Sequence, residues 1–146
     1  MFRFSLQTVL EVRERQEKIK YKEFSQELIR RQTLQARIEA LHQDLARAGR
    51  HTDEVRRRGT SAQPLQLHEH FRNRVNAEIA VLLDQLRQQE QAVEAKRREL
   101  VKARQEHRTL EILKEKEFGR YEMELNRRER AIMDEVASNN HFNPRG

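Results

Sequence analysis

Six histidines are the side chains of this chain that are best suited to metal binding or acid–base chemistry. His68 and His70 are two positions apart and would point to different faces of a helix, while His42 and His51 are nine positions apart. No histidine pair stands out at the four-residue spacing that places two ligands on one helical face. The chain also has no Cys. We therefore expect no metal ion.

Catalysis and cofactor binding are also not indicated. The four glycines, at positions 49, 59, 119 and 146, are too far apart to form a glycine-rich phosphate loop. Ser, His and Asp all occur, but the elements described below would form no pocket that excludes water. The sequence predicts a protein that is not an enzyme, with no catalytic residues and no cofactor.

Arginine clusters raise the possibility of nucleic-acid binding, since guanidinium groups bind phosphates. Aromatic side chains, which stack on bases, make up only 5% of the chain. Several arginines also follow a glutamate by four residues, as in Glu94–Arg98 and Glu124–Arg128, a spacing typical of ion pairs on an exposed helix face. We expect no nucleic-acid partner, and keep nucleic-acid binding as the weakest of three alternatives.

The composition predicts long helices. In 146 residues, 37% of them charged, there are only four Gly and two Pro, which leaves room for few turns. Disorder is the competing interpretation, but Leu, Ile, Val and Phe recur at regular intervals, which is unusual in a disordered chain. We predict an all-α fold: a long antiparallel two-helix coiled-coil hairpin with a C-terminal overhang of the second helix.

The helix boundaries follow from one interruption, the segment "RRRGTSAQPLQ". Three arginines suit the negative end of a helix and Gly59 suits a left-handed cap. We predict a single domain over 1–146, with a helix at about 5–58, a turn at about 59–66, a helix at about 67–137 and a flexible tail at 138–146. Facing residues would then have numbers that add up to about 125, which places Leu6 near Gly119.

The contact between the two helices is predicted to be uneven. If the positions that face the second helix are counted in alternating steps of four and three residues from Leu6 to Val55, they form a good apolar stripe from Leu34 onward. The middle of the helix is poorer, with several charged residues at these positions. The second helix has a similar polar position at His107, which we interpret as a tolerated polar residue in the contact. Beyond the first helix, Ile132, Met133 and Val136 continue an apolar stripe without a partner, and we place a binding surface there.

The sequence also bears on location. There is no apolar run of ~18 residues that would cross a bilayer, so we expect no membrane insertion. The N-terminal segment lacks the basic, apolar and cleavage regions of a signal peptide. The absence of Cys fits a reducing compartment. We expect a cytoplasmic protein.

Two segments resemble the flagellar export protein FliJ family: "FRFSLQTVLEVRERQE" and "LKEKEFGRYEMELNRRERAIMDEVA". The resemblance covers nearly the whole chain. Its matching positions are Phe2, Phe4, Leu6, Leu10, Arg13, Glu17, Tyr121, Arg128, Glu129, Asp134, Glu135 and Ala137.

The resemblance implies an antiparallel α-hairpin, similar to the coiled-coil stalk of rotary ATPases, that works in the flagellar type III export apparatus. The implied partners are the hexameric flagellar export ATPase, the export-gate membrane protein and the flagellar export chaperones. The implied location is the cytoplasmic side of the inner membrane at the flagellar base, with peripheral attachment.

The implied ATPase-ring-binding residues lie at the two chain ends; they are Phe4, Leu6, Leu10, Arg13, Tyr121, Arg128, Ile132, Met133, Asp134 and Glu135. The implied export-gate-binding residues follow the turn; they are Phe71, Val75, Glu78 and Leu82. Glu78 departs from the smooth apolar patch that the family uses, and Val75 and Leu82 can equally be core residues.

Asp134 and Glu135 are unusual because acids near a helix C-terminus oppose the helix dipole. Our hypothesis is that they face basic residues of the ATPase ring, and Arg130 is also placed to pair with Asp134 within the helix. The alternative is that both acids are only solvated at a frayed helix end. The alternative to the stalk function as a whole is a generic coiled-coil adaptor or the stalk homologue of an injectisome.

Overall fold

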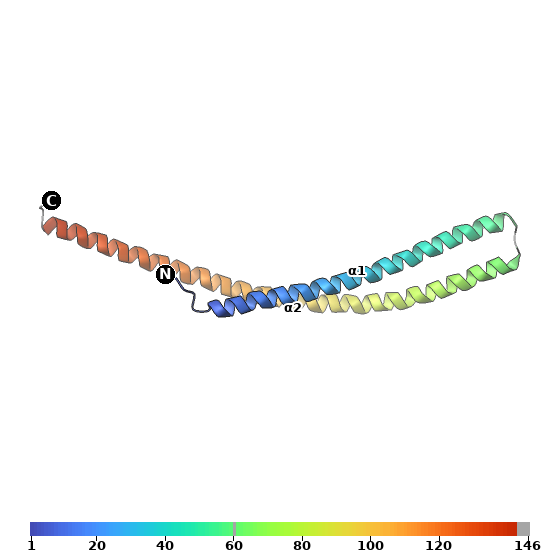
Figure 1. Ribbon diagram of the computed structural model, residues 1–146, viewed down its shortest axis with the longest axis horizontal. Helices are drawn as coiled ribbons and strands as arrows, with labels where there is room; N and C mark the ends of the chain where they lie inside the picture. Colours follow the sequence, from blue (N-terminus) through green and yellow to red (C-terminus); the bar gives the residue numbers. More distant parts are fainter. Residues whose placement is uncertain (60, 143–146) are drawn as a thin grey trace. The chain divides into compact units, whose positions relative to one another are not determined.

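The computed structural model describes residues 1–59 and 61–142, and within these residues the chain folds into two helices, α1 (Gln7–Arg57) and α2 (Ala62–Phe142) (Figure 1). Lys20 of α1 pairs with Glu99 of α2, and Arg37, farther along α1, pairs with Glu78, nearer the start of α2, so the helices are antiparallel. The predicted all-α helical hairpin is confirmed.

The turn is shorter than predicted. Gly59 has a φ of +77°, and its N–H donates to the carbonyl of Arg56 at 3.2 Å, which ends α1 as the sequence indicates. Helix α2 begins at Ala62, five residues before the predicted start at about 67. Pro64 lies in its first turn, where the missing N–H of proline costs no helical hydrogen bond.

The early start of α2 shifts the register of the hairpin. The residue numbers of the facing pairs Arg13–Glu106 and Glu23–Lys96 each add up to 119 rather than about 125. The prediction placed the middle of the turn near residue 62, whereas the helices end and begin at Arg57 and Ala62. At its other end α2 continues to Phe142, so residues 138–142 of the predicted flexible tail are helical, and residues 143–146 lie outside the described residues.

Contacts divide the hairpin into two units, a loop unit (Ile19–Leu100) and a terminal unit (Met1–Lys18 with Val101–Gly146). The apolar core of the loop unit consists of Ile38 and Leu41 of α1 and Val75 and Ile79 of α2, each at most 8% exposed. Leu45, Phe71, Leu82 and Leu86 pack around them. Because two helices bury only one narrow stripe, no large side chain here is completely buried.

In the terminal unit, the N-terminal segment packs against α2. Phe4, Leu10 and Ala103 are buried. The ring of Phe2 lies 5.2 Å from the ring of Phe118, in an edge-on arrangement that aromatic pairs favour. These contacts fix the chain start beside α2 and leave the last part of α2 without a neighbouring helix.

Candidate functional site

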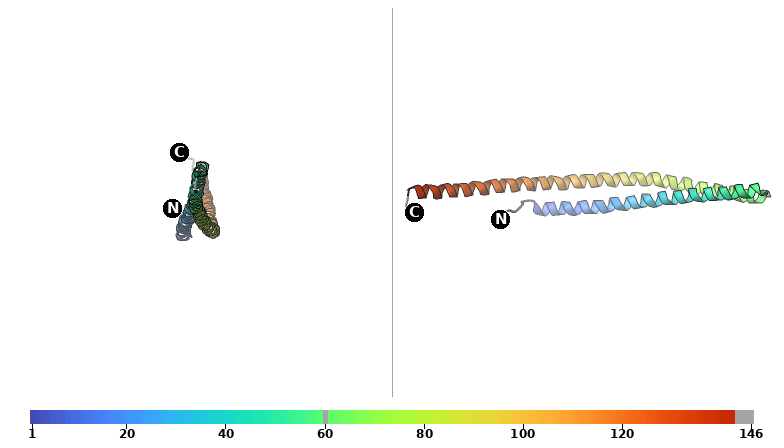
Figure 2. Two further views of the ribbon diagram at one scale, coloured as in Figure 1. Left: turned by 90° about the vertical axis from the view of Figure 1, so that its right-hand side faces the viewer. Right: turned by 90° about the horizontal axis from the view of Figure 1, so that it is seen from above.

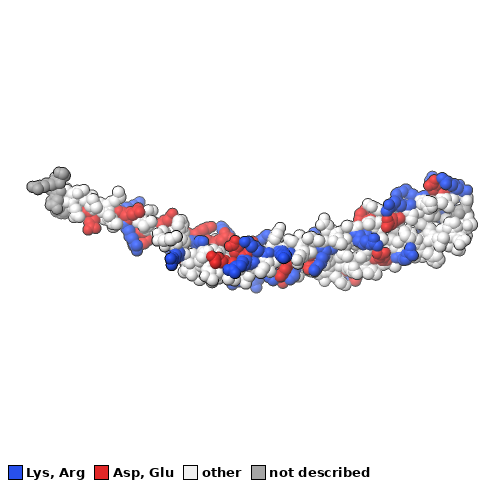
Figure 3. All heavy atoms as spheres, viewed as in Figure 1, with Lys and Arg blue, Asp and Glu red and all other residues white. Residues whose placement is uncertain are grey.

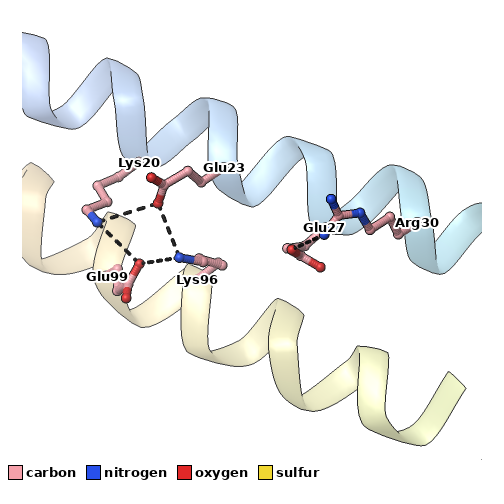
Figure 4. Close-up of polar contacts among 6 residues, drawn as sticks. All are labelled: Lys20, Glu23, Glu27, Arg30, Lys96 and Glu99. Atoms are coloured by element: carbon pink, nitrogen blue, oxygen red, sulfur yellow. Dashed lines mark hydrogen bonds and ion pairs between the residues drawn. The ribbon is translucent and has the colours of Figure 1, made fainter. Parts of the chain in front are cut away.

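Charged side chains make much of the contact between the two helices. In the loop unit, Lys20 and Glu23 of α1 meet Lys96 and Glu99 of α2 in a ring of alternating charge (Figure 4). The N–O distances around the ring lie between 3.2 and 3.5 Å. The hydrogen bond from Lys96, followed by the nearby charge of Lys20, lowers the pKa of Glu99, and the bonds to Glu99 and Glu23 raise the pKa of Lys96. In this section of the hairpin, ion pairs thus run beside the buried apolar side chains of Val93 and Leu100.

The terminal unit has a similar polar section. Arg13 donates a hydrogen bond to Glu106 at 2.8 Å, so this predicted ring-binding residue already has a partner within the chain. His107 lies between two carboxylates, with Nδ1 2.5 Å from Glu17 and Nε2 3.3 Å from Glu111. The side chain of His107 is 18% exposed, so the residue is a partly buried member of the contact.

The predicted ring-binding residues near the chain start are mostly used for packing. Phe4 and Leu10 are buried, and the ring of Tyr121 lies 5.6 Å from that of Phe2. Leu6 is 39% exposed. These residues hold the N-terminal segment against α2, and most of them offer little surface of their own to a partner.

The predicted ring-binding residues near the end of α2 have the opposite character. We call residues 125–142 the free segment, because no residue of α1 lies beside it in Figure 1 or in the right-hand view of Figure 2. Ile132 is 60%, Met133 71% and Val136 52% exposed. The free segment measures about 27 Å at the usual 1.5 Å rise per residue. It presents large apolar side chains to solvent, which is typical of an interaction site.

The charged residues of the free segment are exposed as well. Arg128 pairs with Glu124 of the preceding turn at 3.5 Å, and its side chain is 73% exposed. Asp134 and Glu135 form no ion pair with the described residues, and the suggested pair between Arg130 and Asp134 is not formed. Because α2 continues to Phe142, both acids lie before the last turn, where the helix dipole acts most strongly.

Sequence reasoning missed Met123 as a candidate. Its side chain is 74% exposed, two residues before the free segment. Met123 lies off the stripe that Tyr121, Leu125 and Ile132 continue, so a search for periodic apolar positions passes over it. Unbranched, polarizable side chains of this kind are typical of adaptable binding surfaces.

The predicted export-gate residues belong largely to the core of the loop unit. Val75 is 5% exposed, and Phe71 and Leu82 pack against the core that contains it. Glu78 accepts a hydrogen bond from Arg37 of α1 at 3.0 Å. The guanidinium of Arg74 lies 5.7 Å from the centre of the Phe71 ring. Of these residues, only Glu78 and the outer parts of the Phe71 and Leu82 side chains are accessible to a partner in this structure.

The described residues show neither a metal centre nor a membrane span. No group of three or more His, Cys, Asp or Glu side chains in that part of the chain is placed to hold a metal ion. Neither described helix contains a stretch that is apolar and long enough to cross a bilayer. On the face seen in Figure 3, basic and acidic side chains are intermixed over much of the surface, in keeping with exposed ion pairs along the helices.

Comparison with known proteins gives one match. The family model described as "Flagellar FliJ protein" matches residues 2–146. Neither a curated protein nor a solved structure matches the chain. A match over essentially the whole length, together with the two-helix fold, places this chain in the FliJ family, a non-catalytic component of the flagellar protein export apparatus.

Proposed function

We propose that this protein acts by binding, as a stalk and regulatory component of the flagellar type III export apparatus, and that it catalyses no reaction itself. In this proposal the free segment and the N-terminal segment packed before it enter the ring of the hexameric flagellar export ATPase. Their binding promotes assembly of the ring and its ATPase activity.

The observation that carries this proposal is the exposure of Ile132, Met133 and Val136 on a helix without a neighbour. Large apolar side chains gain free energy when a partner removes them from water, at roughly 25 cal/mol per Å². The residues around them are charged, so a partner that surrounds the helix can recognise both the stripe and the polar faces. A ring of subunits is such a partner.

Asp134 and Glu135 give the proposed contact a charge requirement. Both carboxylates are exposed and form no ion pair with the described residues. We propose that they meet basic side chains in the lining of the ring, where partial exclusion of water would make the pairing stronger than on an open surface. Arg128, whose partner Glu124 is on its own helix, can add a contact to an acidic group.

We further propose that the loop unit connects the ATPase to the export gate and that the protein also contacts flagellar export chaperones. The exposed edges of Phe71, Glu78 and Leu82 would touch the export-gate membrane protein, while Val75 would act through the core that supports them. The protein would then work at the cytoplasmic side of the inner membrane, attached peripherally through these partners.

A titration of the export ATPase tests the ring-binding proposal. ATPase rate and ring assembly are measured with the full chain and with a chain truncated after Leu125. The proposal expects stimulation by the full chain and none by the truncated chain, while circular dichroism shows that both are helical. If neither chain has an effect although both are folded, a generic coiled-coil adaptor becomes the better explanation.

A further inference from the structure

A groove lies between the two helices of the loop unit, next to the turn. It has a volume of about 380 Å³ and a mainly apolar lining. The side chains that form its floor and walls include Ala48, Thr52, Val55, Leu65, Leu67 and Phe71. The groove is open to solvent, since Leu67 is 63% exposed despite its size.

The groove lies outside the apolar core of its unit. The core is formed by Ile38, Leu41, Val75 and Ile79, and only Phe71 both packs against that core and lines the groove. An apolar channel between two helices is the usual binding site for a third, amphipathic helix, which lays its apolar face into it. Shape and lining therefore favour a helical partner over an extended or flat one.

The charge around the groove is basic. Residues 44–75 contain seven arginines and four acidic residues, a net charge of +3 out of the +6 of the whole chain. Residues 76–146 contain 14 basic and 14 acidic residues and are balanced. Half of the excess positive charge of the protein thus lies in the part of the chain that forms the groove.

Several of these arginines have no carboxylate to pair with. Arg56, which follows the lining residue Val55, and Arg72, which follows Phe71, form no ion pair with the described residues. By contrast, Arg97 and Arg98 farther along α2 both bind Glu94, at 2.8 and 3.2 Å. The arginines beside the groove are therefore available to an acidic partner.

We propose that this loop-end groove binds an acidic amphipathic helix of a partner protein; the inference goes beyond ring binding and rests on the proposed loop-unit contact with the export apparatus, with which it shares Phe71. The apolar face of the partner helix packs on Val55, Leu67 and Phe71, and its carboxylates meet Arg56 and Arg72. Apolar burial supplies affinity, and the charge pairs select the partner and speed its association.

A designed peptide provides the probe. It has about 18 residues, with Leu at i, i+3, i+4 and i+7 on one face and Glu on the others, and it carries a fluorophore. One control peptide keeps the apolar face and replaces Glu by Lys, and another has the same composition in scrambled order. Fluorescence anisotropy gives the affinity for the full-length protein, and NMR follows the ring signals of His51 and His68, which line the groove.

We expect the acidic amphipathic peptide to bind, to shift both histidine signals, and to bind more weakly as salt is raised. The scrambled and Lys peptides should bind at least about tenfold more weakly, a difference of 1.4 kcal/mol. Leu67→Glu should weaken binding by at least the same factor. The matched control Leu83→Glu, on an exposed leucine that does not line the groove, should leave it unchanged.

Arg56→Glu with Arg72→Glu should also weaken binding and reduce its salt dependence. Both arginines and Leu67 are exposed, so these variants should remain folded, which circular dichroism checks. The proposal is overturned if the acidic peptide does not shift the histidine signals, or if Leu67→Glu and Leu83→Glu bind it alike. It is equally overturned if duplex DNA, but not the peptide, binds with loss of affinity on Arg56→Glu.

Discussion

The apolar stripe of α2 is buried in one part of the helix and exposed in another. Leu100 is 3% exposed, whereas Ile132 and Val136, which belong to the same kind of spacing, are 60% and 52% exposed. The difference arises from α1 and the N-terminal segment before it: α1 begins at Gln7, and Met1–Arg3 lie beside α2 as far as about Glu124. The same pattern of residues thus serves stability where a partner helix is present and, in the proposed function, binding where it is absent.

The largest expected effect is on ATPase stimulation, when the exposed apolar stripe of the free segment is changed. Ile132→Asp combined with Met133→Asp places charges on the exposed stripe and should abolish stimulation of the export ATPase, because burying a carboxylate without a partner is costly. Titration of the ATPase with each variant measures this. Val81→Asp, at an exposed valine outside the free segment, is the control. Full stimulation by the double variant would refute a role of the stripe.

The next effect is on stability. Leu100→Ala removes a buried side chain and should lower the free energy of unfolding by about 2–4 kcal/mol. Ile132→Ala should change it by no more than about 0.5 kcal/mol, because its side chain is already in water. Urea unfolding followed by circular dichroism measures both. A loss for Ile132→Ala as large as that for Leu100→Ala would show that the free segment is covered in solution.

A smaller effect concerns the polar section of the hairpin. A double-mutant cycle on Arg13 and Glu106, with each replaced by Ala, should give a coupling energy of at most about 1 kcal/mol, because both side chains are more than a third exposed. The coupling should fall between low salt and about 1 M salt. A coupling that is large and independent of salt would mean that this pair is shielded from water.

The smallest effect concerns the pH dependence of the contacts between Glu94 and its two arginine neighbours. The hydrogen bond from Arg97, with a further one from Arg98, lowers the pKa of Glu94 from 4.5 to about 2. Since the folded-state pKa is the lower one, these contacts contribute fully above about pH 4.5 and are lost as the pH falls toward 2. Carboxyl NMR measures the titration. In Arg97→Gln the midpoint should move up toward the ordinary value, and an unchanged midpoint would contradict the assigned cause.

Composition and periodicity were sufficient to predict the two-helix fold. Few breakers, one strong interruption at Gly59 and regular apolar spacing leave few other folds for this chain. The register was harder to predict, because it depends on the residue at which α2 begins. Pro64 is compatible with a first helical turn, so α2 begins at Ala62 rather than near residue 67, and facing pairs such as Arg13–Glu106 are shifted.

The candidate functional sites show a different limit of prediction from the sequence. The exposure of Ile132 and Met133 could be predicted, since it follows from the lengths of the two helices. The engagement of Arg13 with Glu106 could not, because the sequence shows charged residues in the helix contact but not which of them face each other. The loop-end groove was also missed. It forms only when Val55 and Leu67 are brought together at the turn, and their spacing in the sequence does not show this.

The most direct test of the proposed function is to locate the free segment in the assembled export ATPase. The chain has no Cys, so Met133→Cys introduces a single attachment point for a photo-crosslinker. We expect crosslinks from position 133 to ATPase subunits when the ring is assembled, and few from Leu83→Cys in the loop unit. Crosslinks from position 83 but not from position 133 would show that the other end of the hairpin contacts the ring and would contradict this account.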